Sequence, residues 1–183
     1  MLQFLVALIL LNLKKNDSVI VNPLKISRDI IDELESSLIL YFSGVSRSSA
    51  KIIEDQMNSI SDKDKLTAMH KVKESATEIK QELINGDINN LAMKFKQAWE
   101  AKKGTSNSIT NDKINEVESI LDEKGVNSLK VSGAGGGGFI MIFVDPKMKL
   151  QIMQKLKNFG GYVQKFKFVS EGCKSWSTKE IDE

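Results

Sequence analysis

The stretch that decides the fold is SLKVSGAGGGGFIMIFV, residues 128–144. It contains the alternating segment SLKV at 128–131, a glycine-rich loop at 132–138 and the wholly apolar run FIMIFV at 139–144. Short apolar runs bounded by glycines are typical of buried strands. Five glycines within 133–138 permit positive φ and let backbone amides approach an oxyanion. The stretch therefore predicts two strands joined by a loop that either contacts an anion or packs closely against another backbone.

The glycine motif differs from three familiar phosphate-binding loops. Gly133, Gly135 and Gly138 satisfy G-x-G-x-x-G, but a strand follows them where a dinucleotide-binding loop requires a helix. A Walker A loop continues with Lys and Ser or Thr, whereas Phe139 stands here. A protein-kinase loop is followed by V-A-I-K, H-R-D and D-F-G segments, which the remaining sequence lacks. These three classes of nucleotide-binding protein are excluded.

Apolar patterning extends the unit in both directions along the chain. LILYF at 38–42 predicts another buried strand, and several amphipathic helices are expected between it and residue 125. On the carboxy-terminal side we expect a helix that begins at Asp145-Pro146 and a last strand at 162–169. The order is that of a split βαββαβ arrangement. The predicted fold class is α+β, a ferredoxin-like sandwich with extra helices in its first crossover.

The amino terminus carries a separate apolar segment, FLVALILL at 4–11. It is too short to span a bilayer, which takes about 20 residues, and it lacks the features of a signal peptide. A buried strand or strand pair is the remaining interpretation, with a further short strand at 19–21. Because the chain opens inside a core strand, we expect it to be part of a longer protein. The predicted domains are 1–26, a remnant of an amino-terminal domain, and 27–183, the main domain.

Composition narrows the possible function classes. The 183 residues are 41% apolar and 27% charged, which suits a folded domain with a sizeable core. A net charge of +2 argues against a dedicated nucleic-acid binder. One cysteine and one histidine exclude an internal disulfide, a Cys-based zinc site and a His-rich metal site. We expect a cytoplasmic protein with no nucleic-acid or membrane partner and no metal-ligating residues of its own.

A second candidate site is the turn SGVSRSS at 43–49, which leads from the 38–42 strand into a helix. The chain has 24 lysines but only two arginines, so the placement of Arg47 in this turn is notable. Free amides at a helix start attract anions, and a guanidinium adds a two-point donor. The alternative is that Ser46 or Ser48 merely caps the helix while Arg47 is solvated. The candidate substrate-binding residues are Ser43, Gly44, Ser46, Arg47 and Ser48.

These motifs resemble those of the GHMP small-molecule kinases. KVSGAGGGGF at 130–139 is similar to the third motif of that family. LYFSGVSRSSAKIIEDQ at 40–56 and EGCKSW at 171–176 most resemble the branch that phosphorylates D-glycero-D-manno-heptose 7-phosphate. The resemblance covers about residues 19–177 and implies the family's C-terminal domain, which is the carboxy-terminal half of such an enzyme.

The resemblance implies a reaction and a set of cleft residues. The reaction is transfer of the γ-phosphoryl group of ATP to a hydroxyl of a sugar phosphate, with Mg²⁺ neutralising the phosphates. Arg47, Ser46 and Ser48 would hold the sugar phosphate. The cofactor-binding residues that the resemblance places along the cleft are Ser132, Gly133, Ala134, Gly135, Gly136 and Gly137.

The resemblance also implies that part of the kinase machinery is missing. The family's P-x-x-x-G-L-G-S-S-A loop and its catalytic aspartate have no match here, so no catalytic residue is assigned. ATP and Mg²⁺ would be held mostly by a missing half, and the chain alone is expected to be inactive. Its partner would be a separately encoded amino-terminal half or a second copy joined through the amino-terminal strand. The alternative from another class is a non-catalytic, ferredoxin-like ligand-binding or interaction module that binds its anion without ATP.

Overall fold

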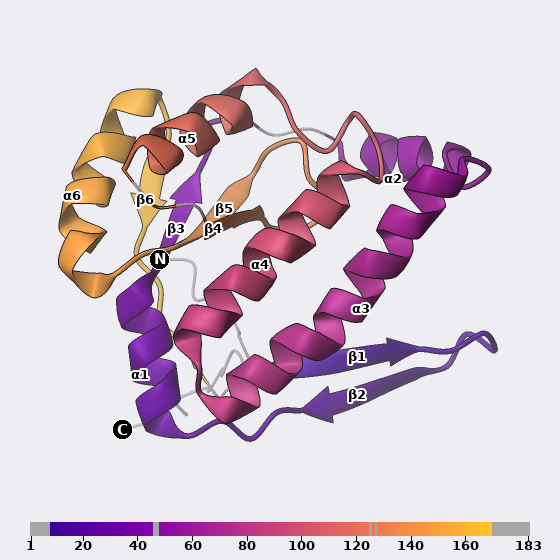
Figure 1. Cartoon of the computed structure of the whole chain (residues 1–183), viewed down its shortest axis with the longest axis horizontal. Coiled ribbons are helices and arrows are strands. Elements are labelled where there is room, and N and C mark those ends of the chain that lie inside the picture. Colours follow the sequence, from indigo (N-terminus) through magenta and orange to yellow (C-terminus); the bar gives the residue numbers. More distant parts are fainter. Residues whose placement is uncertain (1–7, 46–47, 125, 127, 170–183) are drawn as a thin grey trace, which may run out of the picture. The chain divides into compact units, whose positions relative to one another are not determined.

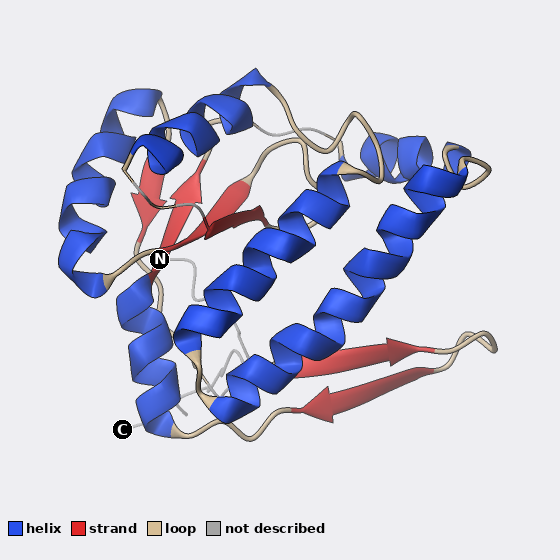
Figure 2. Ribbon diagram, in the orientation of Figure 1, coloured by secondary structure: helices blue, strands red, loops and turns tan. Residues whose placement is uncertain are grey.

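The computed structural model describes residues 8–45, 48–124, 126 and 128–169. The chain divides into two compact units, residues 25–165 and residues 1–24 with 166–183. The larger unit, drawn in Figures 1 and 2, contains α1 (Arg28–Ser37), β3 (Leu38–Phe42), α2 (Ser49–Asn58), α3 (Lys63–Asn85), α4 (Ile88–Lys103), α5 (Asp112–Glu123), β4 (Ser128–Val131), β5 (Phe139–Phe143), α6 (Pro146–Leu156), a 3₁₀ turn (Lys157–Phe159) and β6 (Tyr162–Gln164). No helix in the described ranges is long and apolar enough to cross a membrane.

The larger unit is built on a four-stranded antiparallel sheet with the order β4-β5-β3-β6. The strand β5 lies between β3 and β4, which precede it in the chain, and its central residue Met141 pairs with Leu40 on one side and Lys130 on the other. The α2–α5 helices connect β3 to β4, and α6 connects β5 to β6. This is the split βαββαβ topology, so the predicted α+β, ferredoxin-like fold is confirmed.

One face of the sheet carries the hydrophobic core. Strand alternation directs Ile39 and Tyr41 of β3 and Ile140 and Ile142 of β5 to this face, and all four are almost fully buried. The residues that cover them come mainly from α5 and α6 and include Ile114, Val117, Leu121, Ile152 and Leu156. The opposite face carries Leu40, Phe42, Phe139, Met141 and Lys130. On that face the Phe42 ring packs against those of Phe139 and Tyr162, with centroids 5.3 and 5.2 Å away.

The helix boundaries follow local chemistry. The side chains of Asp62, Asp87 and Asn111 accept hydrogen bonds from the first turns of α3, α4 and α5. The α3 helix ends at Gly86, which adopts the left-handed conformation with φ 74°, as is common for a glycine at a helix end. Pro146 opens α6 after Asp145, as predicted. The last strand ends at Gln164 instead of reaching residue 169.

The buried side of α3 differs from its apolar stripe. Periodicity predicts burial of Leu66, but Leu66 is exposed, whereas Ala68 and Ser75 are buried. The α3 and α4 helices pack along each other, and a Cβ on Gly104, which follows α4, would lie 3.2 Å from the Ala68 Cβ. Close approach of two helices favours small residues over large ones at the contact. Apolar side chains consequently remain on the surface of this region.

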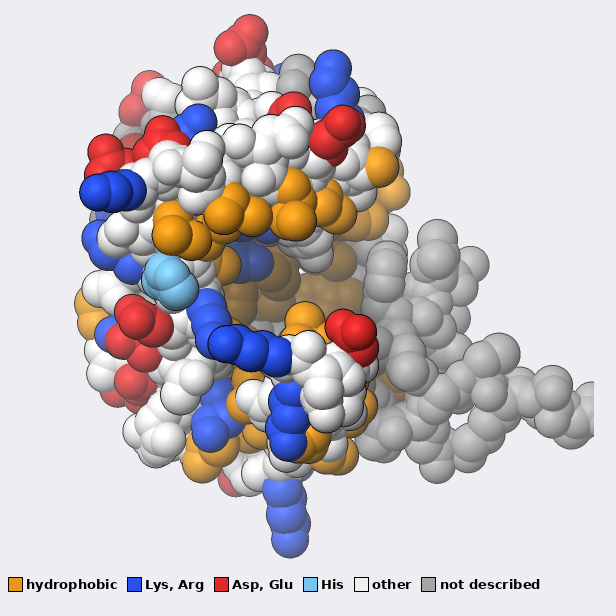
Figure 3. All heavy atoms as spheres, turned by 90° about the vertical axis from the view of Figure 1, so that its right-hand side faces the viewer, with side chains coloured by type: hydrophobic (Ala, Val, Ile, Leu, Met, Phe, Trp, Pro, Cys, Tyr) orange, Lys and Arg blue, Asp and Glu red, His pale blue; other side chains and the backbone are white. Residues whose placement is uncertain are grey.

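The α2 helix also carries exposed apolar side chains. Ile53 and Met57, one helical turn apart, and Ile60 just after the helix are all exposed. Figure 3 faces the side of the molecule on which α2 lies and shows a row of apolar side chains there.

The smaller unit contains a two-stranded antiparallel ribbon of β1 (Ile9–Leu13) and β2 (Val19–Pro23). Leu11 pairs with Val21 and Leu13 with Val19, so one face of the ribbon is wholly apolar. The part of the predicted 4–11 strand that is described, from Leu8 onward, enters this ribbon. Residues 1–7 lie outside the described part of the chain.

Candidate functional site

The glycine loop, residues 132–138, is fixed by backbone hydrogen bonds to three neighbouring segments. The Ser132 amide donates to the Phe139 carbonyl at 2.8 Å, which closes the loop on itself. The Gly136 amide donates to Ile109 and the Gly138 amide to Val45, both at 2.7 Å. The loop is therefore a defined bend that contacts the turn after β3 and the segment before α5.

Two glycines are required by close packing. Gly135 and Gly137 have φ of 110° and 146°, and a Cβ at these positions would lie 2.9 Å from the Ile109 carbonyl oxygen and 2.6 Å from that of Val45. An L-side chain has neither the conformation nor the space there. Close packing of another backbone against the loop is therefore enough to explain why glycine stands at these two positions.

The first half of the loop, residues 132–135, is more exposed than the second half. Ser132 and Gly133 are exposed, Ala134 and Gly135 are half-buried, and Gly136 and Gly137 are buried. A Cβ on Gly133 would meet nothing within 4 Å. Within the described residues, the amides of Gly133, Ala134 and Gly135 make no hydrogen bond. Exposed amides in a positive-φ bend can bind an anion, and this half of the loop has that geometry.

The turn after β3 lies directly against the glycine loop. The Ser43 amide donates to the Gly138 carbonyl at 2.9 Å, and the Val45 carbonyl accepts from the Gly138 amide. The Ser43 hydroxyl is buried and donates to the Val45 carbonyl at 3.2 Å, so this side chain shapes the turn. The structure thus brings the two motifs singled out from the sequence side by side.

The remaining residues of this candidate site are only partly described. Gly44 is exposed, but it has φ 79° and a Cβ there would lie 2.7 Å from the Gly160 carbonyl oxygen, so the close backbone contact accounts for this glycine. Ser48 is the N-cap residue of α2 and is exposed, but its hydroxyl makes no capping hydrogen bond. Ser46 and Arg47 lie outside the described residues, as does the EGCKSW segment at 171–176. The α2 helix begins at Ser49, the last residue of the 43–49 turn, so its first amides belong to this turn.

The α2 helix is tied to the segment that supports the glycine loop. Gln56 Nε2 donates to Thr105 Oγ1 at 2.7 Å, and the Ser108 hydroxyl donates to the Asp55 carboxylate. Thr105 is buried, and its hydroxyl also donates to the Lys102 carbonyl at 2.8 Å. The last turn of α2, the 105–111 segment and the loop are therefore joined by hydrogen bonds.

Two lysines at the loop escaped sequence reasoning. Lys102 in the last turn of α4 donates from its ammonium to the Gly133 carbonyl, and Lys130 of β4 lies three residues before Gly133. Burial and the nearby Lys130 charge lower the pKa of Lys102 to about 8, and burial lowers the pKa of Lys130. Figure 1 shows the end of α4 beside the β4–β5 loop. The chain has 24 lysines, and nothing in the sequence distinguishes these two from the others, because only the fold brings them close together.

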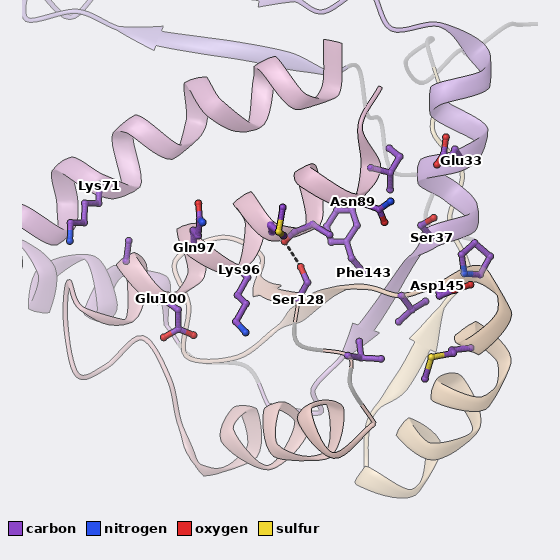
Figure 4. A pocket seen from close by; sticks show the side chains of 18 of the residues that line it. Glu33, Ser37, Lys71, Asn89, Lys96, Gln97, Glu100, Ser128, Phe143 and Asp145 are labelled. Carbon is purple, nitrogen blue, oxygen red and sulfur yellow. Dashed lines mark hydrogen bonds between the residues drawn. The ribbon is translucent and has the colours of Figure 1, made fainter. Parts of the chain in front are cut away.

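A wide groove of about 1510 Å³ lies elsewhere on the same unit, along α4. Figure 4 shows Lys71, Lys96 and Glu100 along one part of it and Glu33 and Asp145 along another. Its charges are mixed, and its lining includes no residue of the glycine loop or of the turn after β3. The groove is therefore separate from the candidate phosphate site.

The described residues contain no group of three or more His, Cys, Asp or Glu side chains that could hold a metal ion. Mg²⁺ in phosphoryl transfer is commonly held by substrate phosphates with one or two carboxylates. The glycine-loop amides fit a phosphate group, whereas a protein cage for the ion is not formed by this part of the chain. The chemistry that these residues support is the binding of a phosphorylated molecule.

Comparison with known proteins finds a matching family model and several relatives. Residues 79–161 match the family model described as GHMP kinases C terminal. D-glycero-alpha-D-manno-heptose 7-phosphate kinase of Campylobacter jejuni is 39% identical over 161 residues, which are 88% of this chain and 48% of that protein. The chain therefore spans about half the length of that relative.

Solved structures give the same result for the fold. The crystal structure of a D-glycero-D-manno-heptose 1-phosphate kinase from Bacteroides thetaiotaomicron has a TM-score of 0.62 and 35% identity, covering 91% of this chain and 45% of that one. The structure of an L. major mevalonate kinase shares the fold, with a TM-score of 0.67 and 15% identity. The match covers 82% of this chain and 44% of the mevalonate kinase. Motifs, topology and comparisons together show that the chain carries a GHMP kinase C-terminal domain.

Proposed function

We propose that this chain is the substrate-side half of a GHMP sugar kinase. The reaction is transfer of the ATP γ-phosphoryl group to a hydroxyl of a sugar phosphate of the heptose 7-phosphate type. The observation that carries the proposal is the pairing of the glycine loop with the turn after β3 through the Gly138–Val45 and Ser43–Gly138 hydrogen bonds. Resemblance to the heptose phosphate kinases supports the choice of substrate.

In this proposal, each motif has a separate task. The exposed amides of the loop, at Gly133 to Gly135, face a phosphate group, while Gly136 and Gly137 fix the bend. Ser46, Arg47 and Ser48 hold the sugar phosphate, and Ser43 and Gly44 form the turn that carries them. Catalysis by such a site is mostly positioning and electrostatic stabilisation. ATP and Mg²⁺ supply the phosphoryl group and neutralise its charge, with most of their contacts outside this chain.

We further propose that activity needs an amino-terminal half, with residues 1–26 joining that half. The apolar ribbon face formed by Leu11, Leu13, Val19 and Val21 is exposed and suits a hydrophobic partner surface. The 183-residue chain alone is expected to turn over less than about once per minute, against about 1–1,000 per second for typical enzymes. Coexpression with the preceding half of a heptose kinase is expected to restore turnover.

The test is an ADP-release assay with heptose 7-phosphate and MgATP, on the chain alone and on the coexpressed pair. Turnover by the pair, lost in Arg47→Met, supports the kinase proposal. Isothermal titration of the chain with heptose 7-phosphate, with and without MgATP, addresses the non-catalytic module. Heptose 7-phosphate affinity that is the same with and without MgATP, together with no ADP release by the coexpressed pair, would favour the non-catalytic module over the kinase.

A further inference from the structure

The arrangement of Lys102 and Lys130 places two cations beside the exposed half of the glycine loop. Lys102 reaches Gly133 from the end of α4, and its ammonium donates to the carbonyl of that residue. Lys130, three residues before Gly133, belongs to β4, where it pairs with Met141, and its charge acts on Lys102. Because Leu129 and Val131 point into the core, Lys130 lies on the opposite face of the sheet.

Neither lysine has a negative partner among the described residues. The neighbouring Lys103 shows the contrast, because its ammonium lies 2.9 Å from both Glu100 and Glu118. Burial and the Lys130 charge lower the pKa of Lys102, and burial lowers the pKa of Lys130. Two like charges removed from water without a counter-charge are unfavourable.

An anion between the two ammonium groups would reverse this unfavourable arrangement. Each lysine would then form a charge-assisted hydrogen bond, and the unpartnered amides of Gly133, Ala134 and Gly135 would add neutral donors. Five donors on a small, partly exposed surface suit the three oxygens of a phosphate monoester. Burial lowers the pKa of both lysines, and a bound anion would raise it.

We propose that Lys102, Lys130 and the Gly133–Gly135 amides form a phosphate-binding subsite. The subsite rests on the proposed function, because in a sugar kinase the phosphoryl group can come from the sugar phosphate or from the nucleotide. Lys102 and Lys130 are binding residues in this assignment. They neither carry the reacting hydroxyl nor replace the missing general base.

The experiment is an NMR titration of the full 183-residue chain, with the lysine ammonium and glycine amide signals observed. The probes are inorganic phosphate, heptose 7-phosphate, the unphosphorylated heptose, and ADP without Mg²⁺. We expect phosphate-containing probes to shift the signals of Lys102, Lys130 and Gly133 and to raise the Lys102 pKa. A response to heptose 7-phosphate without one to ADP identifies the sugar phosphate as the source, and the reverse identifies the nucleotide.

Two variants and a control accompany the titration. Lys102→Met and Lys130→Met are each expected to weaken phosphate binding about tenfold. Lys147→Met removes the same charge from an exposed position at the other end of β5 and is expected to change binding less than twofold. Lys130→Arg keeps the charge and is expected to retain most of the binding.

The outcomes separate this inference from the kinase proposal. Wild-type binding that both Met variants retain would overturn the subsite, as would the absence of any response to the phosphate probes. Neither result alters the ADP-release assay of the coexpressed pair, which tests the kinase proposal. Conversely, phosphate binding could depend on both lysines while the coexpressed pair releases no ADP. That result would support the subsite and contradict the kinase proposal.

Discussion

At the scale of single residues, Lys102 is the position where binding and stability are expected to conflict. Lys102 is half-buried, its ammonium donates to the Gly133 carbonyl, and the Lys130 charge acts on it. Lys103 beside it forms ion pairs with Glu100 and Glu118. A residue retained only for packing would lose stability when replaced. A half-buried cation whose role is to bind an anion should instead increase stability when its charge is removed.

Lys102→Met is therefore expected to raise the melting temperature at pH 7. Discounted for partial exposure, the gain is about 1 kcal/mol, or about 2–4 °C for a chain of this length. The reason is that methionine keeps the packing of the lysine stem and removes the charge. Differential scanning calorimetry without phosphate measures it, with Lys147→Met as the matched control. A lower melting temperature for Lys102→Met would contradict the picture of an uncompensated charge.

The lowered pKa of Lys102 predicts how the stability of the chain depends on pH. Its pKa is about 8 in the folded chain against the ordinary 10.5, so between these values the unfolded chain binds more protons. The free energy of unfolding should therefore rise with pH across the interval between these two pKa values through this group. Urea unfolding across that range measures the slope, and Lys102→Met should flatten it. An unchanged slope in the variant would assign the effect to other groups.

Gly137 gives a second residue-scale prediction, with Gly133 as its matched control. In Gly137→Ala the new Cβ would combine positive φ with a contact of 2.6 Å to the Val45 carbonyl oxygen. We expect that variant to lose about 3 kcal/mol in unfolding free energy. Gly133→Ala has positive φ but open space. A smaller loss, about 1 kcal/mol, is expected for it. Chemical denaturation compares the two, and equal losses would mean that the loop does not pack against the turn after β3 as described.

At the scale of elements, the sequence predicts most boundaries because capping and periodicity are local. The expected strands at 38–42 and 128–131 and the helix start at Asp145-Pro146 are confirmed, and the observed helix ends at Asp62, Asp87 and Gly86 follow the same local rules. The buried face of α3 was predicted wrongly at Leu66, because contact with α4 selects small residues that a hydrophobicity pattern ignores. The sequence does not predict a role for Lys102 and Lys130 for a related reason, because only the tertiary structure brings their charges together.

The ribbon of β1 and β2 supports an element-scale prediction. Leu11 and Val21 form a cross-strand pair on its apolar face, and they are 51% and 54% exposed. A surface of this kind promotes association. The double variant Leu11→Asp and Val21→Asp is expected to reduce self-association of the chain in sedimentation experiments and to block pairing with an amino-terminal half.

Asn12→Asp is the control for the ribbon because it adds charge on the other face, where Asn12 pairs with Ile20. It should leave association unchanged. If it disrupted association as strongly as the double variant, net charge and not the apolar face would be responsible.

At the scale of the whole molecule, the division of the chain gives the last prediction. The buried hydrophobic cluster, Ile39 through Leu156, lies entirely within residues 25–165. A segment with its own core should fold alone. We therefore expect a 25–165 fragment to unfold cooperatively, with a melting temperature within about 3 °C of a 25–183 fragment.

The domain predicted from the sequence extends instead to residue 183. It therefore requires that removal of 166–183 lower both the melting temperature and the urea m-value, which scales with the surface exposed on unfolding. Calorimetry and urea titration of the two fragments, with the full chain as reference, distinguish the two boundaries. Matching values would mean that the core is self-sufficient at residue 165, and a loss in both quantities would mean that it needs the carboxy-terminal segment.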